Sequence, residues 1–166
     1  MAKYYDDGGN CMSAQDWEEV DRSSRELLSC FLETKLSAEN IGESHGNVCW
    51  DLSCVVNGKR VAVEVKDRGY DHDRFGDILV EDSKQECISK KDFDAALAVN
   101  VFKDGVLCAA SLFDRRAKHF RKKAPVTTLV KGALHDYIWK EFTSLPQRLK
   151  VRFRRDADGW NFRKIC

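Results

Sequence analysis

Apolar residues alternate with polar ones on both sides of an Asn-Gly pair at Asn57-Gly58. The alternating apolar positions are Trp50, Leu52, Cys54 and Val56 before the pair and Val61, Val63 and Val65 after it. A period of two is typical of strands that bury one face. Asn-Gly is a strong hairpin signal, because a type I′ turn requires positive φ at both central residues. The pattern therefore predicts a two-stranded ribbon in which Val56 faces Lys59.

Elsewhere the spacing of apolar residues changes to that of a helix. Ser13 is suited to an N-cap, with Asp16 three positions later, and apolar residues then recur at helical spacing as far as Phe31. We expect a helix from Ala14 to Lys35. The other expected elements are a loop at 67–77, a helix from Ile78 to Lys90, strands over Ala95–Phe102 and Val106–Phe113, a basic helix over Asp114–Lys123, and strands over Pro125–Lys131, Tyr137–Leu145 and Gln147–Arg155. This order predicts an α/β or α+β domain.

Composition is that of one globular domain spanning residues 1–166, with 43% apolar and 33% charged residues. No apolar run approaches the roughly 18 residues of a membrane span, and the N-terminal residues lack the apolar region of a signal peptide. The seven cysteines are scattered and include no Cys-x-x-Cys. We therefore expect no membrane association, no zinc site, no disulfide framework, and a cytoplasmic location in a bacterial or phage-infected cell.

Charge is distributed unevenly along the chain. Residues 1–113 contain 13 lysines and arginines against 22 acids, whereas residues 114–166 contain 15 against 5. Six of the nine residues at 115–123 are cationic. A basic C-terminal third (114–166) favours a partner made of phosphates, and an asymmetric surface without such a partner is the alternative.

The hairpin register places two carboxylates face to face. Counting outward from the turn pairs Asp51 with Glu64, and Lys66 lies two residues further along the same strand face. Like charges opposite each other destabilise a sheet unless they are neutralised. Mg²⁺ is suited to that task because it prefers carboxylate oxygens and binds through one or two of them together with phosphates. The alternative is a solvated strand face on which Glu64 pairs with Lys66 or Arg60.

Asp51 followed by Glu64-Val65-Lys66 resembles the PD-(D/E)xK nuclease superfamily, and the residues after Glu64-Val65-Lys66 resemble its small phage-borne members. The resemblance implies a restriction-endonuclease-like fold with a central mixed sheet flanked by helices. It also implies a similarity in chemistry to Holliday-junction-resolvase-like endonucleases. Asp51, Glu64 and the Val65 backbone carbonyl would bind Mg²⁺, for which Mn²⁺ would substitute, and Lys66 would serve the attacking water.

The same resemblance assigns supporting residues from two helices. In that superfamily the first helix often supplies a further acid, and the acids on the expected helix include Glu18, Glu19, Asp21 and Glu26. Asp21 is our candidate because it lies closest to the apolar stripe, and the alternative is that all four are solvated charges on the helix surface. The second helix can place a lysine or glutamine near the site, and Lys84 and Gln85 are at that position.

Cations outside the site are expected to contact the phosphate backbone. The expected nucleic-acid-binding residues are Arg68 and Arg74 after the second strand, Arg115, Arg116, Arg121 and Lys122 on the basic helix, and Arg148, Lys150, Arg152 and Arg154 on the last long strand.

These observations predict Mg²⁺-dependent hydrolysis of DNA phosphodiester bonds. The alternative is a non-catalytic nucleic-acid-binding module that uses the basic C-terminal region, and a protein-interaction domain is a weaker third reading. Three questions stay open at this point: the structure of the substrate, whether it is DNA or RNA, and whether the site binds one or two metal ions. The resemblance to the superfamily also allows a homodimer.

Overall fold

The computed structural model describes residues 4–5, 11–44, 48–125 and 137–165. Of the described residues, about half are in strands and 22% are in two helices. The fold is therefore β-rich, and the predicted restriction-endonuclease-like α/β class is wrong. Two helices are too few to cover both faces of the central sheet, and a second, three-stranded sheet covers part of one face.

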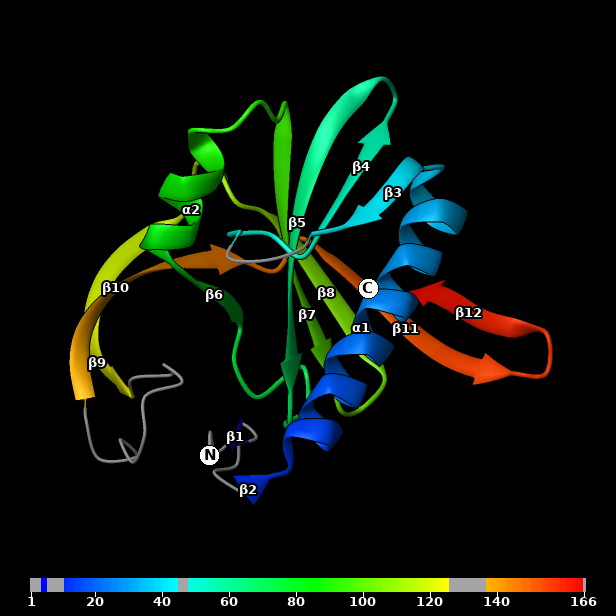
Figure 1. Cartoon of the computed structure of the whole chain (residues 1–166), viewed down its shortest axis with the longest axis horizontal. Coiled ribbons are helices and arrows are strands. Elements are labelled where there is room, and N and C mark those ends of the chain that lie inside the picture. Colours follow the sequence, from blue (N-terminus) through cyan, green and yellow to red (C-terminus); the bar gives the residue numbers. More distant parts are fainter. Residues whose placement is uncertain (1–3, 6–10, 45–47, 126–136, 166) are drawn as a thin grey trace.

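A curled seven-stranded mixed sheet forms the centre of the molecule (Figure 1). Its order is β12-β11-β8-β7-β5-β4-β3, in which β5 and β7 are parallel and the other neighbours are antiparallel. The strands are β3 (Glu39–Glu43), β4 (Leu52–Val56), β5 (Lys59–Arg68), β7 (Ala95–Phe102), β8 (Val106–Ser111), β11 (Leu149–Asp156) and β12 (Gly159–Lys164).

The remaining elements are two smaller sheets and the two helices. A three-stranded antiparallel sheet has the order β6-β10-β9, from β6 (Asp77–Glu81), β10 (Tyr137–Pro146) and β9 (Lys118–Pro125). Two short strands, β1 (Tyr4–Tyr5) and β2 (Cys11–Met12), pair near the N-terminus. The helices are α1 (Ala14–Leu36) and α2 (Asp82–Ser89).

The β4–β5 hairpin has the register that the sequence predicts. Val56 pairs with Lys59 and Leu52 with Val63, and Asn57 and Gly58 have φ of 51° and 75°. Positive φ at both positions explains why the turn requires this residue pair. The hairpin prediction is confirmed.

Helix α1 begins as the sequence predicts, at a capping box in which Ser13 and Asp16 satisfy each other's backbone N–H groups. It ends at Ser37, which has left-handed φ of 51°. Leu28 and Leu32 are fully buried and pack in one core against β4, β5 and β7. The 23-residue helix is therefore held by an apolar stripe at helical spacing.

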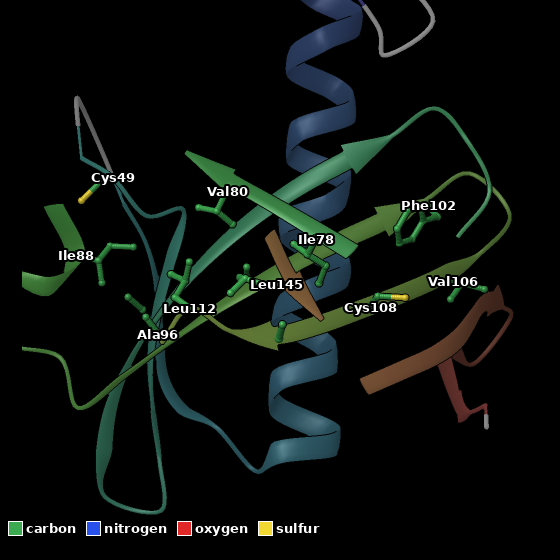
Figure 2. Packing of buried hydrophobic residues seen from close by; sticks show 13 residues of the cluster. Cys49, Ile78, Val80, Ile88, Ala96, Phe102, Val106, Cys108, Leu112 and Leu145 are labelled. Atoms are coloured by element: carbon green, nitrogen blue, oxygen red, sulfur yellow. The ribbon is translucent and has the colours of Figure 1, made fainter. Parts of the chain in front are cut away.

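A second core lies on the opposite face of the seven-stranded sheet, beneath α2 and the three-stranded sheet (Figure 1). Ile78 and Val80 of β6, Leu145 of β10 and Ile88 of α2 contribute buried side chains to it (Figure 2). Consecutive residues of β7 enter the two different cores, as Ala98 and Val99 show. The central strands are thus covered on both faces.

One predicted helix is replaced by a strand, and another begins later than the sequence predicts. Residues 118–125 form β9 after a turn, and residues 78–81 belong to β6, so that the second helix begins only at Asp82. Both segments form strands because each pairs with β10, which lies between β6 and β9 in the three-stranded sheet. Residues 126–131 of the predicted Pro125–Lys131 strand lie outside the described residues.

Cys49, just before β4, forms a disulfide with Cys87 of α2, with a Cα–Cα distance of 6.2 Å. The expectation that the cysteines form no disulfide is wrong for this pair. The bond could not be predicted because 38 residues separate the two cysteines and their approach depends on how α2 packs beside β6 and β10. Cys30, Cys54 and Cys108 are free thiols. In the described part of the chain, no helix is long and apolar enough to cross a membrane.

Replacing both Cys49 and Cys87 by Ala should lower the free energy of unfolding by about 2–4 kcal/mol, because the crosslink restricts the unfolded chain. Guanidinium denaturation with and without reductant measures this difference. Reductant should destabilise the wild-type protein and leave the double variant unchanged. A Cys30→Ala control should keep the full response to reductant, and a wild-type protein indifferent to reductant would contradict the prediction.

Candidate functional site

Asp51 and Glu64 come together at the open end of the β4–β5 hairpin. The backbone N–H of Asp51 donates to the Val63 carbonyl at 2.9 Å, and this bond continues the hairpin one residue beyond β4. The Asp51 side chain accepts a hydrogen bond from the Val65 N–H through Oδ2 at 2.8 Å. Asp51 also helps to raise the pKa of Glu64, as expected for neighbouring carboxylates. The structure thus brings the predicted acid pair together.

Glu64 is the most deeply buried acid of this group, with 3% of its surface exposed. Burial raises the pKa of Glu64 to about 7, the Lys84 ammonium opposes this rise, and Asp51 adds to it. Lys84 of α2 contacts Glu64 Oε1 directly. A buried carboxylate with one cationic partner can accept a second cation, because the second cation would further favour its ionised form.

Lys66 lies on the same face of β5 as Glu64 and is half-buried. Burial lowers the pKa of Lys66, Lys84 lowers it further, and Glu64 opposes the change. A lysine with a lowered pKa releases its proton more readily than an exposed one and can act as a general base. Lys66 and Lys84 therefore place two nitrogen groups beside the acid pair.

The two supporting residues predicted from the second helix have different surroundings. Lys84 contacts Glu64, whereas Gln85 donates to the Leu112 carbonyl and its Oε1 lies 3.2 Å from the Thr143 hydroxyl. Gln85 thus connects α2 to β10 and to the end of β8, and the structure does not bring it to the acid pair.

Arg25 of α1 is a site residue that sequence reasoning missed. Its guanidinium lies 3.1 Å from Asp21, 3.3 Å from Asp51 and 3.7 Å from Glu43. Burial raises the pKa of Asp21, Arg25 lowers it, and Asp51 and Glu43 raise it. The predicted first-helix acid thus reaches the site through Arg25. The spacing Asp21–Arg25 indicates only an ion pair along a helix, so nothing in the sequence connects Arg25 to Asp51.

The side chains available for a divalent cation are the two facing acids. Among residues 4–5, 11–44, 48–125 and 137–165, no group of three or more His, Cys, Asp and Glu side chains is arranged to hold a metal ion. A magnesium site would therefore combine Asp51, Glu64, a backbone carbonyl, water and substrate phosphate, which is a donor set that Mg²⁺ accepts. Since the N–H and C=O of a strand residue point toward the same neighbouring strand, the Val65 carbonyl lies on the side of Asp51. Asp51, Glu64 and the Val65 carbonyl are thus the groups that would hold the ion.

The cations predicted to bind nucleic acid are dispersed over several elements. Arg148 is engaged by Asp114, with bonds of 2.8 and 3.1 Å, and Arg74 lies over the rings of Tyr70 and Phe75. Arg115 and Arg116 are exposed in the turn before β9, and Arg121 and Lys122 lie on β9 itself. Arg68 ends β5.

Lys150, Arg152 and Arg154 share one face of β11. The strand pairing connects Lys66 to Asn100, Asn100 to Cys108, and Cys108 to Lys150. The β11 cations therefore lie on the same face of the sheet as the acid pair. Three strand spacings of about 4.8 Å separate Lys150 from Lys66.

Comparison of the chain with protein-family models, with curated proteins and with solved structures found no match. The resemblance of Asp51 and Glu64-Val65-Lys66 to the PD-(D/E)xK motif stays a prediction from these residues alone.

Replacing Glu64 by Gln should remove a loss of stability that the wild-type protein shows between acidic and neutral pH in the presence of EDTA. The folded-state pKa of about 7 exceeds the ordinary value of 4.5. The proton on Glu64 therefore contributes stability that is complete below pH 4.5 and lost as the pH rises through 7. The stability of Glu64→Gln relative to wild type should rise by about 3 kcal/mol across this window.

Urea denaturation from pH 4 to 8 measures this relative stability. Glu86→Gln is the matched control, because Glu86 lies exposed on α2 and Lys90 lowers its pKa. The control should show no such rise. A Glu64→Gln curve parallel to wild type would contradict the burial of an ionisable carboxylate.

Proposed function

We propose that this protein hydrolyses DNA phosphodiester bonds with Mg²⁺, through Asp51, Glu64 and Lys66. The observation that carries the proposal is the buried Glu64 beside Asp51, with Lys84 in contact with Glu64 and Lys66 on the same strand face. Partly desolvated acids and lysines gathered at one place are typical of catalytic sites, where burial and neighbouring charges shift pKa values. The proposal concerns the site and does not depend on the fold class predicted from the sequence.

The residues have distinct roles in this proposal. Asp51 and Glu64 would hold the ion together with the Val65 carbonyl, and the ion would supply electrostatic stabilisation of the charge on the phosphate. Lys66, in its neutral form, takes a proton from the water whose oxygen attacks phosphorus. As the new P–O bond forms, the ester P–O bond breaks and the leaving oxygen receives a proton from solvent water. Lys84 stabilises negative charge beside Glu64.

The charges outside the site favour DNA as the partner. The basic C-terminal third includes Lys150, Arg152 and Arg154, on the same face of the sheet as Lys66. Phosphate contacts of this kind supply affinity without reading sequence. A homodimer would place two such sites on one substrate. We include it in the proposal only because the resemblance to the superfamily implies it.

The second candidate function is a nucleic-acid-binding module without catalysis. The observation that favours it is the pairing of each acid with a protein cation, Asp51 with Arg25 and Glu64 with Lys84. A structural ion-pair network produces the same pairs and also shifts pKa values. The two functions differ in whether the acid pair binds metal and whether Lys66 affects cleavage.

The compartment is part of the proposal. DNA as substrate favours the cytoplasm of a bacterial or phage-infected cell, whereas the Cys49–Cys87 disulfide is more typical of an oxidising environment. Trapping of thiols in intact cells would show which state these two cysteines adopt.

Asp51→Asn should abolish Mn²⁺ binding measured by calorimetric titration. The substitution keeps an oxygen for the Val65 N–H and removes the charge that the ion requires. Glu43→Gln is the control, because Glu43 contacts the same Arg25 and is not assigned to the metal. Undiminished binding in Asp51→Asn would exclude the proposed ligand set.

Lys66→Ala should reduce DNA cleavage by about 10²- to 10⁴-fold while largely preserving DNA affinity. Cleavage and affinity are measured on the same folded protein, with Mg²⁺ for cleavage and EDTA for binding. Lys59→Ala, an exposed lysine on the same strand, should leave both unchanged. Cleavage by Lys66→Ala at the wild-type rate would reject the mechanism, and absence of cleavage by wild type on linear and branched DNA would favour the binding module.

A further inference from the structure

The strands β9 and β10 form a ribbon that extends beyond the three-stranded sheet. β6 pairs with β10 only over Phe142–Pro146, whereas β9 pairs with β10 over its whole length. Residues 121–125 and 137–141 are thus joined to each other in the described part of the sheet and to no third strand. Figure 1 shows β9 and β10 curving away from the seven-stranded sheet. Five residue pairs make the free part of the ribbon about 17 Å long.

Both faces of this ribbon carry cations next to an aromatic ring. On one face Arg121 and Lys123 lie over the ring of Trp139, with cation-to-centroid distances of 5.5 and 5.7 Å. On the other face Lys122 lies 5.1 Å from the centroid of Phe142, which stacks on Phe120. The register agrees, because Trp139 pairs with Lys123, and Phe142 with Phe120.

The aromatic rings hold the cations near the ribbon while leaving them exposed. Trp139 is 55% exposed and Phe120 is 38% exposed, so apolar surface and charge are presented together. A cation over a ring gains about 0.5–1 kcal/mol at an exposed site and is more restricted than a free side chain. Acids are scarce here, since Glu141 is the one acid within the two strands. Lys140 is engaged by Glu81 at 3.0 Å.

The base of the ribbon is fixed to the helix that carries Lys84. The buried Thr143 hydroxyl donates to Asp82 at 2.5 Å and also lies 2.9 Å from His119. Asp82 is two residues before Lys84 on α2. Whatever the ribbon binds is therefore held at a defined position relative to the acid pair.

Taking DNA from the proposed function, we infer that the β9–β10 ribbon enters the major groove of duplex DNA. A flat phosphate surface would use one cationic face, whereas a groove presents phosphates on both sides of whatever lies in it. The major groove of B-form DNA, about 12 Å wide, admits a two-stranded ribbon. The major groove of A-form RNA is too narrow and deep for side chains to read, so the ribbon discriminates duplex DNA from duplex RNA.

The experiment measures binding in EDTA, where cleavage does not interfere. Fluorescence anisotropy is recorded over a series of salt concentrations with a duplex DNA, its separated strands and a duplex RNA of the same sequence. One double variant is Arg121→Gln/Lys123→Gln and the other is Lys118→Gln/Lys122→Gln, one pair for each face. The matched control is Lys59→Gln/Lys91→Gln, which removes two exposed cations outside the ribbon.

Each ribbon variant should weaken binding to duplex DNA by about tenfold or more at 0.1 M salt, and the slope of log affinity against log salt should fall by about 1.8, or 0.9 per contact. The control should match wild type, and the effect on duplex RNA should be small. An effect confined to one face, or equal to that of the control, would overturn groove insertion. So would tighter binding to single strands that Trp139→Ala removes, because this identifies a stacking platform.

Thermal unfolding checks that each variant is folded. If a double variant is unfolded, the single variant of the same face, Arg121→Gln or Lys122→Gln, is used in its place. The inference and the proposed function can fail separately. Duplex binding that depends on both faces, without cleavage by wild type, supports the ribbon and rejects the nuclease. If the wild-type protein cleaves DNA and neither ribbon variant changes cleavage or affinity, the nuclease is supported and insertion of the ribbon is rejected.

Discussion

Glu64 is a carboxylate almost completely removed from water, and such a group requires compensating charge. Lys84 supplies that charge from α2, so the position of α2 matters to the stability of the central strand as well as to the site. Asp51, one strand away, increases the requirement and is itself compensated by Arg25 of α1. Each helix thus supplies one cation to the acid pair: α1 supplies Arg25 to Asp51, and α2 supplies Lys84 to Glu64.

Helix α2 has eight residues, which is too short for a helix to be stable by itself. Its position is defined by the disulfide to Cys49, by the buried Ile88 and by the bond between Asp82 and Thr143. These contacts connect α2 to the Asp51 segment, to the core and to β10. One short helix therefore connects the acid pair, the seven-stranded sheet and the β9–β10 ribbon.

Local patterns in the sequence predict the hairpin, α1, β7 and β11, because in each case the residues that define the element lie within it. The Asn57-Gly58 turn is the clearest example, since two residues determine the whole β4–β5 register. β9 could not be predicted in this way. Its cations show no alternation, and its pairing with β10 depends on residues about twenty positions further along the chain. The predicted fold class is wrong for the same reason, because residues expected in helices form strands that pair with the distant β10.

The candidate site shows the same limit. Asp51, Glu64 and Lys66 follow from a single hairpin, whereas Arg25 and the disulfide depend on how helices pack on the sheet. Lys84 could be suggested only through the resemblance, and Gln85, its neighbour, is used to connect α2 to β8 and β10.

Burial of β5 on both faces has a consequence for how this chain can vary in length. Val63 lies in one core while Glu64 is buried on the other face of the strand, in contact with Lys84. One inserted or deleted residue between Lys59 and Glu64 would exchange the two faces, so that a carboxylate would enter an apolar core and a valine would replace it beside Lys84. Length changes in this strand are thus excluded, whereas the exposed turn at 157–158 between β11 and β12 can accept them.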